Sequence, residues 1–248
     1  MWYQGEEQMP LLVKAAYRSI KAHAGEHPVI LLTKDNIRQI VSKSDIWDND
    51  IFDYLNQGKI TMTHFSDLCR TALLYSFGGI WIDATIFMQW DVDRIAEGVP
   101  LATGRRERAK DSFNVCFNKW TSFFIGCEKG NPLLGFIYEL LHEHLKREGR
   151  FMEYLIEDYA FMTAYNHLPY VREMADNVPL MPNRLKELEV KRNKEYEATY
   201  YEEVCKNVPF TKMTYKHKCK TKTRSGKMTN YGHMLACWMT TASRNHHQ

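Results

Sequence analysis

The 248-residue chain lacks the features that mark a membrane-spanning or zinc-stabilised protein. No apolar run approaches the roughly 20 residues that a membrane span needs. None of the six cysteines belongs to a CxxC pair or a short His/Cys cluster, which argues against a structural zinc site. The N-terminus has no charged stretch followed by an apolar one, as a secretory signal would have. These absences predict a soluble cytoplasmic protein with free thiols, which works at a membrane only from its surface.

Acidic residues are absent after Glu203, although the net charge of the whole chain is only +3. The same segment carries nine cations: Lys206, Lys212, Lys216, Lys218, Lys220, Lys222, Arg224, Lys227 and Arg244. A basic segment at 206–248 suits an anionic partner, such as nucleic acid, anionic lipid or a phosphorylated ligand. A solvated, locally flexible basic face has the same composition, so both interpretations stay open.

Length and composition indicate one globular domain, with the basic segment as a small appendage. The chain is 44% hydrophobic and 25% charged, as globular domains are. Apolar residues recur at helical spacing in 10–23 and 35–42, and the apolar run 28–33 between them is typical of a buried strand. Helix, strand and helix in this order predict an α/β fold with a mainly parallel central sheet flanked by helices.

The best-defined unit of the sequence joins a helix to a short strand. Apolar residues from 65 to 77 fall on one helical face, and Gly78 and Gly79 then end the helix. The residues 80–82 form a short apolar strand, and Asp83 follows at its carboxyl end. Ligands bind at the carboxyl ends of strands in open α/β sheets, so Asp83 is well placed for chemistry.

Further elements follow in the second half of the chain. An amphipathic helix is predicted for Pro132–Leu145, because proline is favoured at a first helical position, and another for 154–167. The charged segment 185–203 fits a surface helix or a loop. From Phe210 onward the alternation of Thr, Lys and Tyr predicts a twisted hairpin or an exposed edge strand, with Ser225-Gly226 as a turn.

Three charged residues of the helix–strand unit form a candidate site. Asp67 and Arg70 lie one helical turn apart on the same side, and Asp83 lies at the strand end. Carboxylates can hold hydroxyl groups or, together with phosphates, a hard divalent cation. Taken alone, Ser66-Asp67 is more often a helix cap than a sugar ligand, and Thr63 is the other candidate for the cap. Arg70 alone would be a solvated or salt-bridged arginine. Their joint occurrence in this order favours a functional site.

The segments His64–Arg70, Leu73–Tyr75 and Gly78–Thr85 resemble the central motif of the bacterial capsular polysaccharide synthesis glycosyltransferases. These enzymes belong to a wider group of DxD-containing sugar transferases, which includes yeast mannosyltransferases and the large clostridial glucosylating toxins. Four flanking segments also resemble the family: Trp2–Gly5, Thr121–Leu145, Leu155–Tyr159 and Phe210–Lys216. The resemblance covers most of the chain and thins at about 170–205 and after 220.

This resemblance implies a GT-A type fold. It also implies an enzyme that transfers a sugar from a UDP- or GDP-linked donor to a hydroxyl acceptor. The acceptor is a saccharide or a lipid-linked saccharide, the metal is Mn2+ or Mg2+, and retention of the anomeric configuration is favoured. Asp83 would hold the metal, while Asp67 and Arg70 would hold the donor sugar's hydroxyls. Thr85 stands where a full DxD has a second acid. A metal would therefore be held by Asp83 with water and phosphates, or would be only weakly required.

The same resemblance assigns the rest of the donor site. Trp2 or Tyr3 would pack on the nucleobase near Gln4. Apart from the resemblance, the charges of the C-terminal segment suggest that His217, flanked by Lys216 and Lys218, reaches the diphosphate and that the two lysines neutralise the leaving group. An exposed basic strand is the alternative for His217.

Four further residues complete the candidate set. Ser66 and Gly79 belong to the matched motif and are expected near the donor. Asp158 is a candidate for an acceptor-side or base role, or is a solvated acid on a helix face. His64 is expected to pack or to cap the helix rather than to take part in catalysis.

Two other functions are consistent with parts of the sequence. A protein-glycosylating effector would use the same chemistry, but the small size and the lack of delivery segments count against it. A non-catalytic nucleic-acid-binding protein would use the basic segment. That segment lacks the interleaved aromatic residues of a single-strand binder, so no nucleic-acid partner is expected. Contact of the basic segment with the inner face of the cell membrane is a further expectation.

Overall fold

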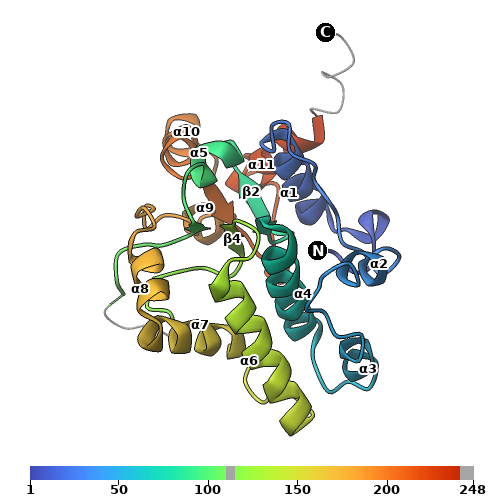
Figure 1. Ribbon diagram of the computed structural model, residues 1–248. Coiled ribbons are helices and arrows are strands. Elements are labelled where there is room, and N and C mark those ends of the chain that lie inside the picture. Colours follow the sequence, from blue (N-terminus) through green and yellow to red (C-terminus); the bar gives the residue numbers. More distant parts are fainter. Residues whose placement is uncertain (110–114, 241–248) are drawn as a thin grey trace. The chain divides into compact units, whose positions relative to one another are not determined.

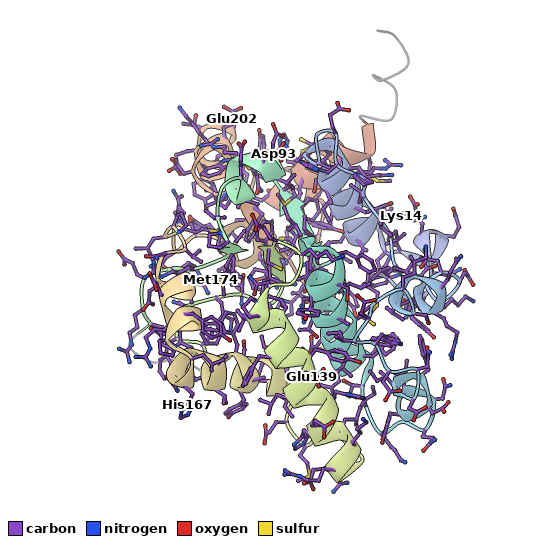
Figure 2. The ribbon with its side chains drawn as sticks, in the orientation of Figure 1. Lys14, Asp93, Glu139, His167, Met174 and Glu202 are labelled. Atoms are coloured by element: carbon purple, nitrogen blue, oxygen red, sulfur yellow. The ribbon has the colours of Figure 1, made fainter. Side chains whose placement is uncertain are left out.

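The structure is a computed structural model that describes residues 1–109 and 115–240, and it is mostly helical (Figure 1). Contacts within the chain divide it into two compact units, which are described separately. The first unit comprises Met1–Thr33, Ile82–Glu97 and Met181–Gln248, and the second comprises Lys34–Trp81 and Gly98–Leu180. In both units polar helical side chains such as Glu202 and His167 are exposed and point away from the ribbon (Figure 2).

The first unit contains helices around a two-stranded sheet. Its elements are η1 (Glu6–Gln8), α1 (Leu11–Ala22), β2 (Ile86–Met88), α5 (Val92–Ala96), α9 (Glu187–Val190), α10 (Ala198–Asn207), β5 (Phe210–Lys212) and α11 (Asn230–Thr240). Strands β2 and β5 pair antiparallel, with Ile86 opposite Lys212 and Met88 opposite Phe210. Helix α1 packs against β2 and α11.

Helix α1 confirms the amphipathic helix predicted near the N-terminus. Its apolar positions, among them Leu12, Ala16 and Ile20, are buried, as the spacing requires. Ser19 is also fully buried on this face, and its hydroxyl accepts a hydrogen bond of 3.0 Å from the Met88 backbone N–H. This bond ties α1 to β2.

The second unit is built on three packed helices. Its elements are α2 (Ile37–Val41), α3 (Ile51–Asn56), α4 (Met62–Phe77), β1 (Gly79–Ile82, whose last residue is assigned to the first unit), β3 (Leu101–Thr103), β4 (Phe124–Cys127), α6 (Pro132–Glu148), α7 (Ile156–His167) and α8 (Pro169–Asp176). Helix α6 packs against α4 and α7. The strand order is β1-β4-β3, and β3 and β4 pair antiparallel with Leu101 opposite Cys127.

Both ends of α4 follow from its sequence. Thr61 caps the helix, rather than Thr63 or Ser66, because its hydroxyl accepts from the His64 N–H at 3.2 Å while the His64 ring accepts from the Thr61 N–H. Gly78 ends the helix at a φ of 69°, and a Cβ there would lie 2.7 Å from the Lys129 backbone nitrogen. Only glycine therefore fits this position, from which the chain enters β1.

The prediction of a mainly parallel central sheet is wrong. In the described part of the chain the strands form one small three-stranded sheet and one antiparallel pair, and no parallel central sheet is present. The apolar run 28–33 forms no strand, because it is not buried on both faces: the Ile30 side chain is 65% exposed. A short apolar run has no period that distinguishes a buried strand from an extended connection.

The later elements are close to the predictions. Helices α6 and α7 are confirmed, and Asn131 caps α6 before Pro132. The segment 185–203 contains both α9 and the start of α10, with a loop between them. Strand β5 is buried rather than an exposed edge, although a bridge between Lys222 and Met228 encloses the predicted turn. Residues 230–240 form α11, which no pattern indicated, and 241–248 of the basic segment lie outside the described residues.

Candidate functional site

Among the described residues, the most enclosed charged group is the Arg70 cluster of the second unit, defined here as Asp67, Arg70 and Glu157. The Arg70 side chain on α4 is 4% exposed. Its guanidinium donates to both oxygens of Glu157, at 3.0 Å from Nε and 2.7 Å from Nη2, and Nη2 also donates to Asp67 Oδ1. The remaining nitrogen donates to the Ser122 carbonyl at 2.5 Å. A guanidinium held on all these sides has a fixed orientation.

The Arg70 cluster contains more carboxylates than cations. Two carboxylates share one guanidinium, and Asp158 follows Glu157 on α7. Burial raises the pKa of Glu157 well above its ordinary value, against the opposing effect of Arg70, and the carboxylates of Asp67 and Asp158 raise it further. The cluster therefore holds a fixed guanidinium and an excess of carboxylate oxygens in an enclosed setting.

Asp158 is tied to an aromatic stack rather than exposed on a helix face. Its Oδ1 accepts a hydrogen bond of 2.7 Å from the indole Nε1 of Trp120. Trp120 is fully buried and stacks on Phe161, with 3.8 Å between ring centroids. Burial raises the pKa of Asp158, and the Trp120 hydrogen bond opposes this shift. Asp158 is therefore half-buried and hydrogen-bonded, and its acceptor-side or base role stays a prediction.

Asp83 forms the second charged group, in the first unit, together with Lys212. The Lys212 Nζ lies 2.7 Å from Asp83 Oδ2, and their side chains are 20% and 32% exposed. A turn follows Asp83, in which the Ile86 N–H donates to the Asp83 carbonyl at 3.0 Å. Ile86 is also the β2 residue opposite Lys212 in the antiparallel pair. Strand register therefore sets Lys212 beside Asp83.

The residues around Asp83 fit a metal only as a partial ligand set. Within residues 1–109 and 115–240, no group of three or more His, Cys, Asp or Glu side chains could hold a metal ion. Thr85, where a second acid would stand, is 8% exposed, and its carbonyl accepts from the Met213 N–H. Magnesium in phosphate sites is commonly held by one or two carboxylates together with substrate phosphates and water. Asp83 can supply one such carboxylate, in exchange for or alongside Lys212.

The predicted nucleobase residues lie in the first unit with Asp83. The Trp2 ring meets Tyr215 edge-on, with 5.4 Å between centroids, and its buried indole Nε1 has no hydrogen-bond partner among the described residues. Its backbone N–H donates to the Leu32 carbonyl at 2.9 Å. Tyr3 is half-buried and Gln4 is exposed. The structure thus holds Trp2 in place through its backbone rather than through the polar atom of its ring.

Four other predicted residues are exposed or half-buried. Lys216 and His217 lie on the surface of the first unit, and His217 Nδ1 lies 2.7 Å from the carboxylate of Glu189 on α9. Ser66 is half-buried on α4. Gly79 is exposed at a φ of 93°, where an added Cβ would meet no atom of the described chain within 4 Å. The donor roles of all four stay predictions.

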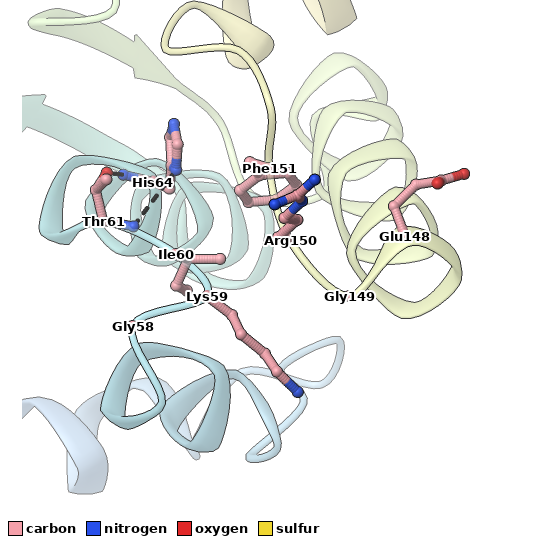
Figure 3. A pocket seen from close by; sticks show the side chains of 9 residues that line it. All are labelled: Gly58, Lys59, Ile60, Thr61, His64, Glu148, Gly149, Arg150 and Phe151. Atoms are coloured by element: carbon pink, nitrogen blue, oxygen red, sulfur yellow. Dashed lines mark hydrogen bonds between the residues drawn. The ribbon is translucent and has the colours of Figure 1, made fainter.

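His64 lines a cavity of about 530 Å³ in the second unit (Figure 3). The cavity is bounded by 58–61, His64 and 148–151, so none of the other predicted site residues lines it. His64 is buried, packs edge-on against Phe151 and caps α4, and burial lowers the pKa of its imidazole. The expectation that His64 packs or caps the helix is confirmed.

Comparison with known proteins matches residues 1–234 to the family described as capsular polysaccharide synthesis protein. The chain belongs to this family. The match extends over nearly the whole chain and confirms the resemblance carried by the central motif. It gives the protein a role in capsular polysaccharide synthesis, and hence sugar substrates. A comparison with curated proteins finds no match. Among the described residues, no helix combines the length and apolar character that crossing a membrane requires.

Two residues of these charged groups are not identified as site residues by the sequence patterns. Lys212 is one of several cations in the basic segment, and no local pattern connects it to Asp83, 129 residues earlier. Glu157 carries a detectable signal, because it shares a helical face with Ala160, Phe161 and Ala164, all buried. A carboxylate on the apolar face of a helix requires a partner, and that partner is Arg70.

Proposed function

We propose that this member of the capsular polysaccharide synthesis family is a glycosyltransferase that uses a UDP- or GDP-linked sugar. The acceptor is a hydroxyl group of a saccharide or of a lipid-linked saccharide. The observation that carries the proposal is the Arg70 cluster: an enclosed guanidinium, fixed by two carboxylates on α4 and α7. A GT-A type fold and retention of the anomeric configuration are part of the proposal and rest on the resemblance of the central motif.

In this proposal the Arg70 cluster holds the hydroxyl groups of the donor sugar. Arg70 only donates hydrogen bonds, whereas the ionised Asp67 only accepts them, so together they match a hydroxyl group, which both donates and accepts. Enclosure strengthens these contacts because competing water is reduced. Such a site discriminates between sugars by leaving a buried polar group unpaired when a hydroxyl is missing.

In this proposal Asp83 lies beside the diphosphate of the donor. Trp2 or Tyr3 packs on the nucleobase, near Gln4. Mn2+ or Mg2+, with Asp83 as a ligand, would neutralise charge on the diphosphate when bound. Lys216 and His217 are proposed to add positive charge near the leaving group. The donor phosphate accepts the acceptor's proton, so no dedicated general base is required.

The test is a panel of nucleotide sugars, with binding and hydrolysis measured in the presence and absence of Mn2+. We expect hydrolysis of one donor, which Asp83→Ala abolishes. Asp67→Ala and Arg70→Lys should weaken discrimination between sugars more than affinity for the nucleotide. Binding to none of the nucleotide sugars, together with salt-sensitive binding to nucleic acid, would refute the proposal.

Contact of the basic segment with an anionic membrane surface or a lipid-diphosphate acceptor is a further part of the proposal. The lysines at 216, 218, 220 and 222 are exposed, as such contact requires. Co-sedimentation with vesicles containing anionic lipid tests it. Equal recovery with neutral and anionic vesicles would contradict it.

A further inference from the structure

We propose that Lys212 binds the diphosphate of the donor, and that the Asp83–Lys212 ion pair is exchanged for a Lys212–phosphate contact when the donor binds. This inference rests on the proposed function. It assigns a donor-binding role to a residue outside the central motif. It is carried by the position of Lys212 in the sheet, by its distance from Asp83 and by the limited stabilisation that such a pair provides.

The position of Lys212 is fixed by a strand pair whose other residues are buried. Phe210, Thr211 and Met213 around it are buried, and the Lys212 N–H donates to the Leu185 carbonyl at 2.8 Å. The backbone is therefore anchored on either side of the lysine. The side chain has a flexible four-carbon stem, so its ammonium can move while the strand stays in place.

The contact with Asp83 differs in enclosure from a second ion pair of the same unit. Lys227 and Glu195 are also 2.7 Å apart, but their side chains are 62% and 45% exposed, as is common at a protein surface. The Asp83–Lys212 pair is more enclosed, so both groups give up more hydration to form it. Ion pairs that solvent still reaches return little stability. The Asp83–Lys212 pair thus costs hydration while adding little stability, so the Lys212 ammonium can exchange this partner for a charged ligand at small cost.

The chemistry of the pair suits a diphosphate. An ammonium is a compact charge with three N–H donors. It binds phosphate oxygens as readily as it binds carboxylate oxygens. The Asp83 carboxylate alone would repel a diphosphate, and a cation between them removes that repulsion. Lys212 supplies this cation from the protein itself, whether or not a divalent metal also binds at Asp83.

The experiment measures binding of UDP and GDP, and of the matching nucleosides, to the full chain in EDTA and in Mn2+ by calorimetry. The variants are Lys212→Met, Asp83→Asn and the double variant, with Lys227→Met as the matched control. In EDTA we expect Lys212→Met to weaken binding of the diphosphate about tenfold or more, because a charged hydrogen bond is lost. Nucleoside binding should not change, and Asp83→Asn alone should strengthen diphosphate binding.

The double variant separates direct contact from charge balance. If Lys212 touches the phosphates, the double variant stays as weak as Lys212→Met or nearly so. Recovery of wild-type affinity in the double variant would show that Lys212 only neutralises Asp83, and unchanged affinity in Lys212→Met would show no role; either result overturns the inference alone. Absence of nucleotide binding by the unaltered chain would instead overturn the proposed function and the inference with it.

Discussion

The Arg70 cluster and the Asp83–Lys212 pair are built from the same kinds of group, yet they differ in enclosure. Arg70 is almost fully buried and contacts two carboxylates and a backbone carbonyl. Lys212 is partly exposed, and its ammonium lies 2.7 Å from the Asp83 carboxylate. A group enclosed by fixed partners is rigid, whereas a group that solvent reaches can exchange a partner. The first arrangement suits recognition of a fixed shape, and the second suits binding and release of a charged ligand.

The largest expected effect is on stability, at Arg70. Arg70→Ala leaves Glu157 and Asp67 as buried carboxylates without their shared cation. Loss of one partner of a buried pair costs about 3–5 kcal/mol of unfolding free energy. Chemical denaturation measures it. Arg38→Ala is the matched control, because Arg38 is exposed and rests on the Phe52 ring. Equal losses in the two variants would contradict the contrast drawn between enclosed and exposed charges.

The pH dependence of stability tests the charge imbalance at Glu157. Its pKa is raised in the folded state, so folded protein keeps a proton that the unfolded chain releases above a pH of about 4.3. Glu157 therefore makes its full contribution to the free energy of unfolding below the pKa that it has in the unfolded chain. This contribution decreases as pH rises toward the folded-state pKa, by up to about 1.4 kcal/mol per pH unit.

Glu157→Gln removes this titration while it keeps the shape of the side chain. The difference in unfolding free energy between the unaltered chain and Glu157→Gln, measured from about pH 4 to pH 8, should fall with rising pH. Taking the difference cancels the opposite behaviour of acids such as Glu187, whose pKa Arg184 lowers to about 2. A difference that does not vary with pH would show that Glu157 titrates as an ordinary carboxyl group.

Asp158 gives a smaller effect that separates anchoring from base catalysis. Asp158→Ala leaves the buried Trp120 N–H without its acceptor, at a cost of about 1–3 kcal/mol. Asp158→Asn keeps an oxygen acceptor and should recover most of that stability. If Asp158 acts as a base, Asp158→Asn will still lose transfer activity; retained activity in Asp158→Asn would assign Asp158 an anchoring role only.

The smallest expected effect on stability is at the Asp83–Lys212 pair. Lys212→Met should change the free energy of unfolding by about 1 kcal/mol or less, since the pair is reached by solvent and the apolar replacement suits the strand. Thermal unfolding measures this shift, with Lys227→Met as the control. If Lys212→Met lowers the free energy of unfolding as much as Arg70→Ala does, the difference in enclosure between the two charged groups has no effect on stability.

Four of the helices and the end of α4 before strand β1 can be predicted from local patterns. Helical spacing locates α1, α4, α6 and α7, and the glycines after Phe77 locate the end of α4, because each signal depends on residues a few positions apart. The prediction of a buried strand at 28–33 is wrong, and so is the parallel sheet inferred from it. Strand burial depends on what covers both faces, and that is decided by distant parts of the chain.

The family, the helix that carries Asp67 and Arg70, and the strand that ends at Asp83 can all be read from local sequence patterns. The partners of these charges cannot, because Glu157 is 87 residues from Arg70 and Lys212 is 129 residues from Asp83. Local spacing fixes which side chains share a helical face. Pairing of charges across such separations depends instead on helix packing and strand register, which form only when the whole chain buries its apolar surface.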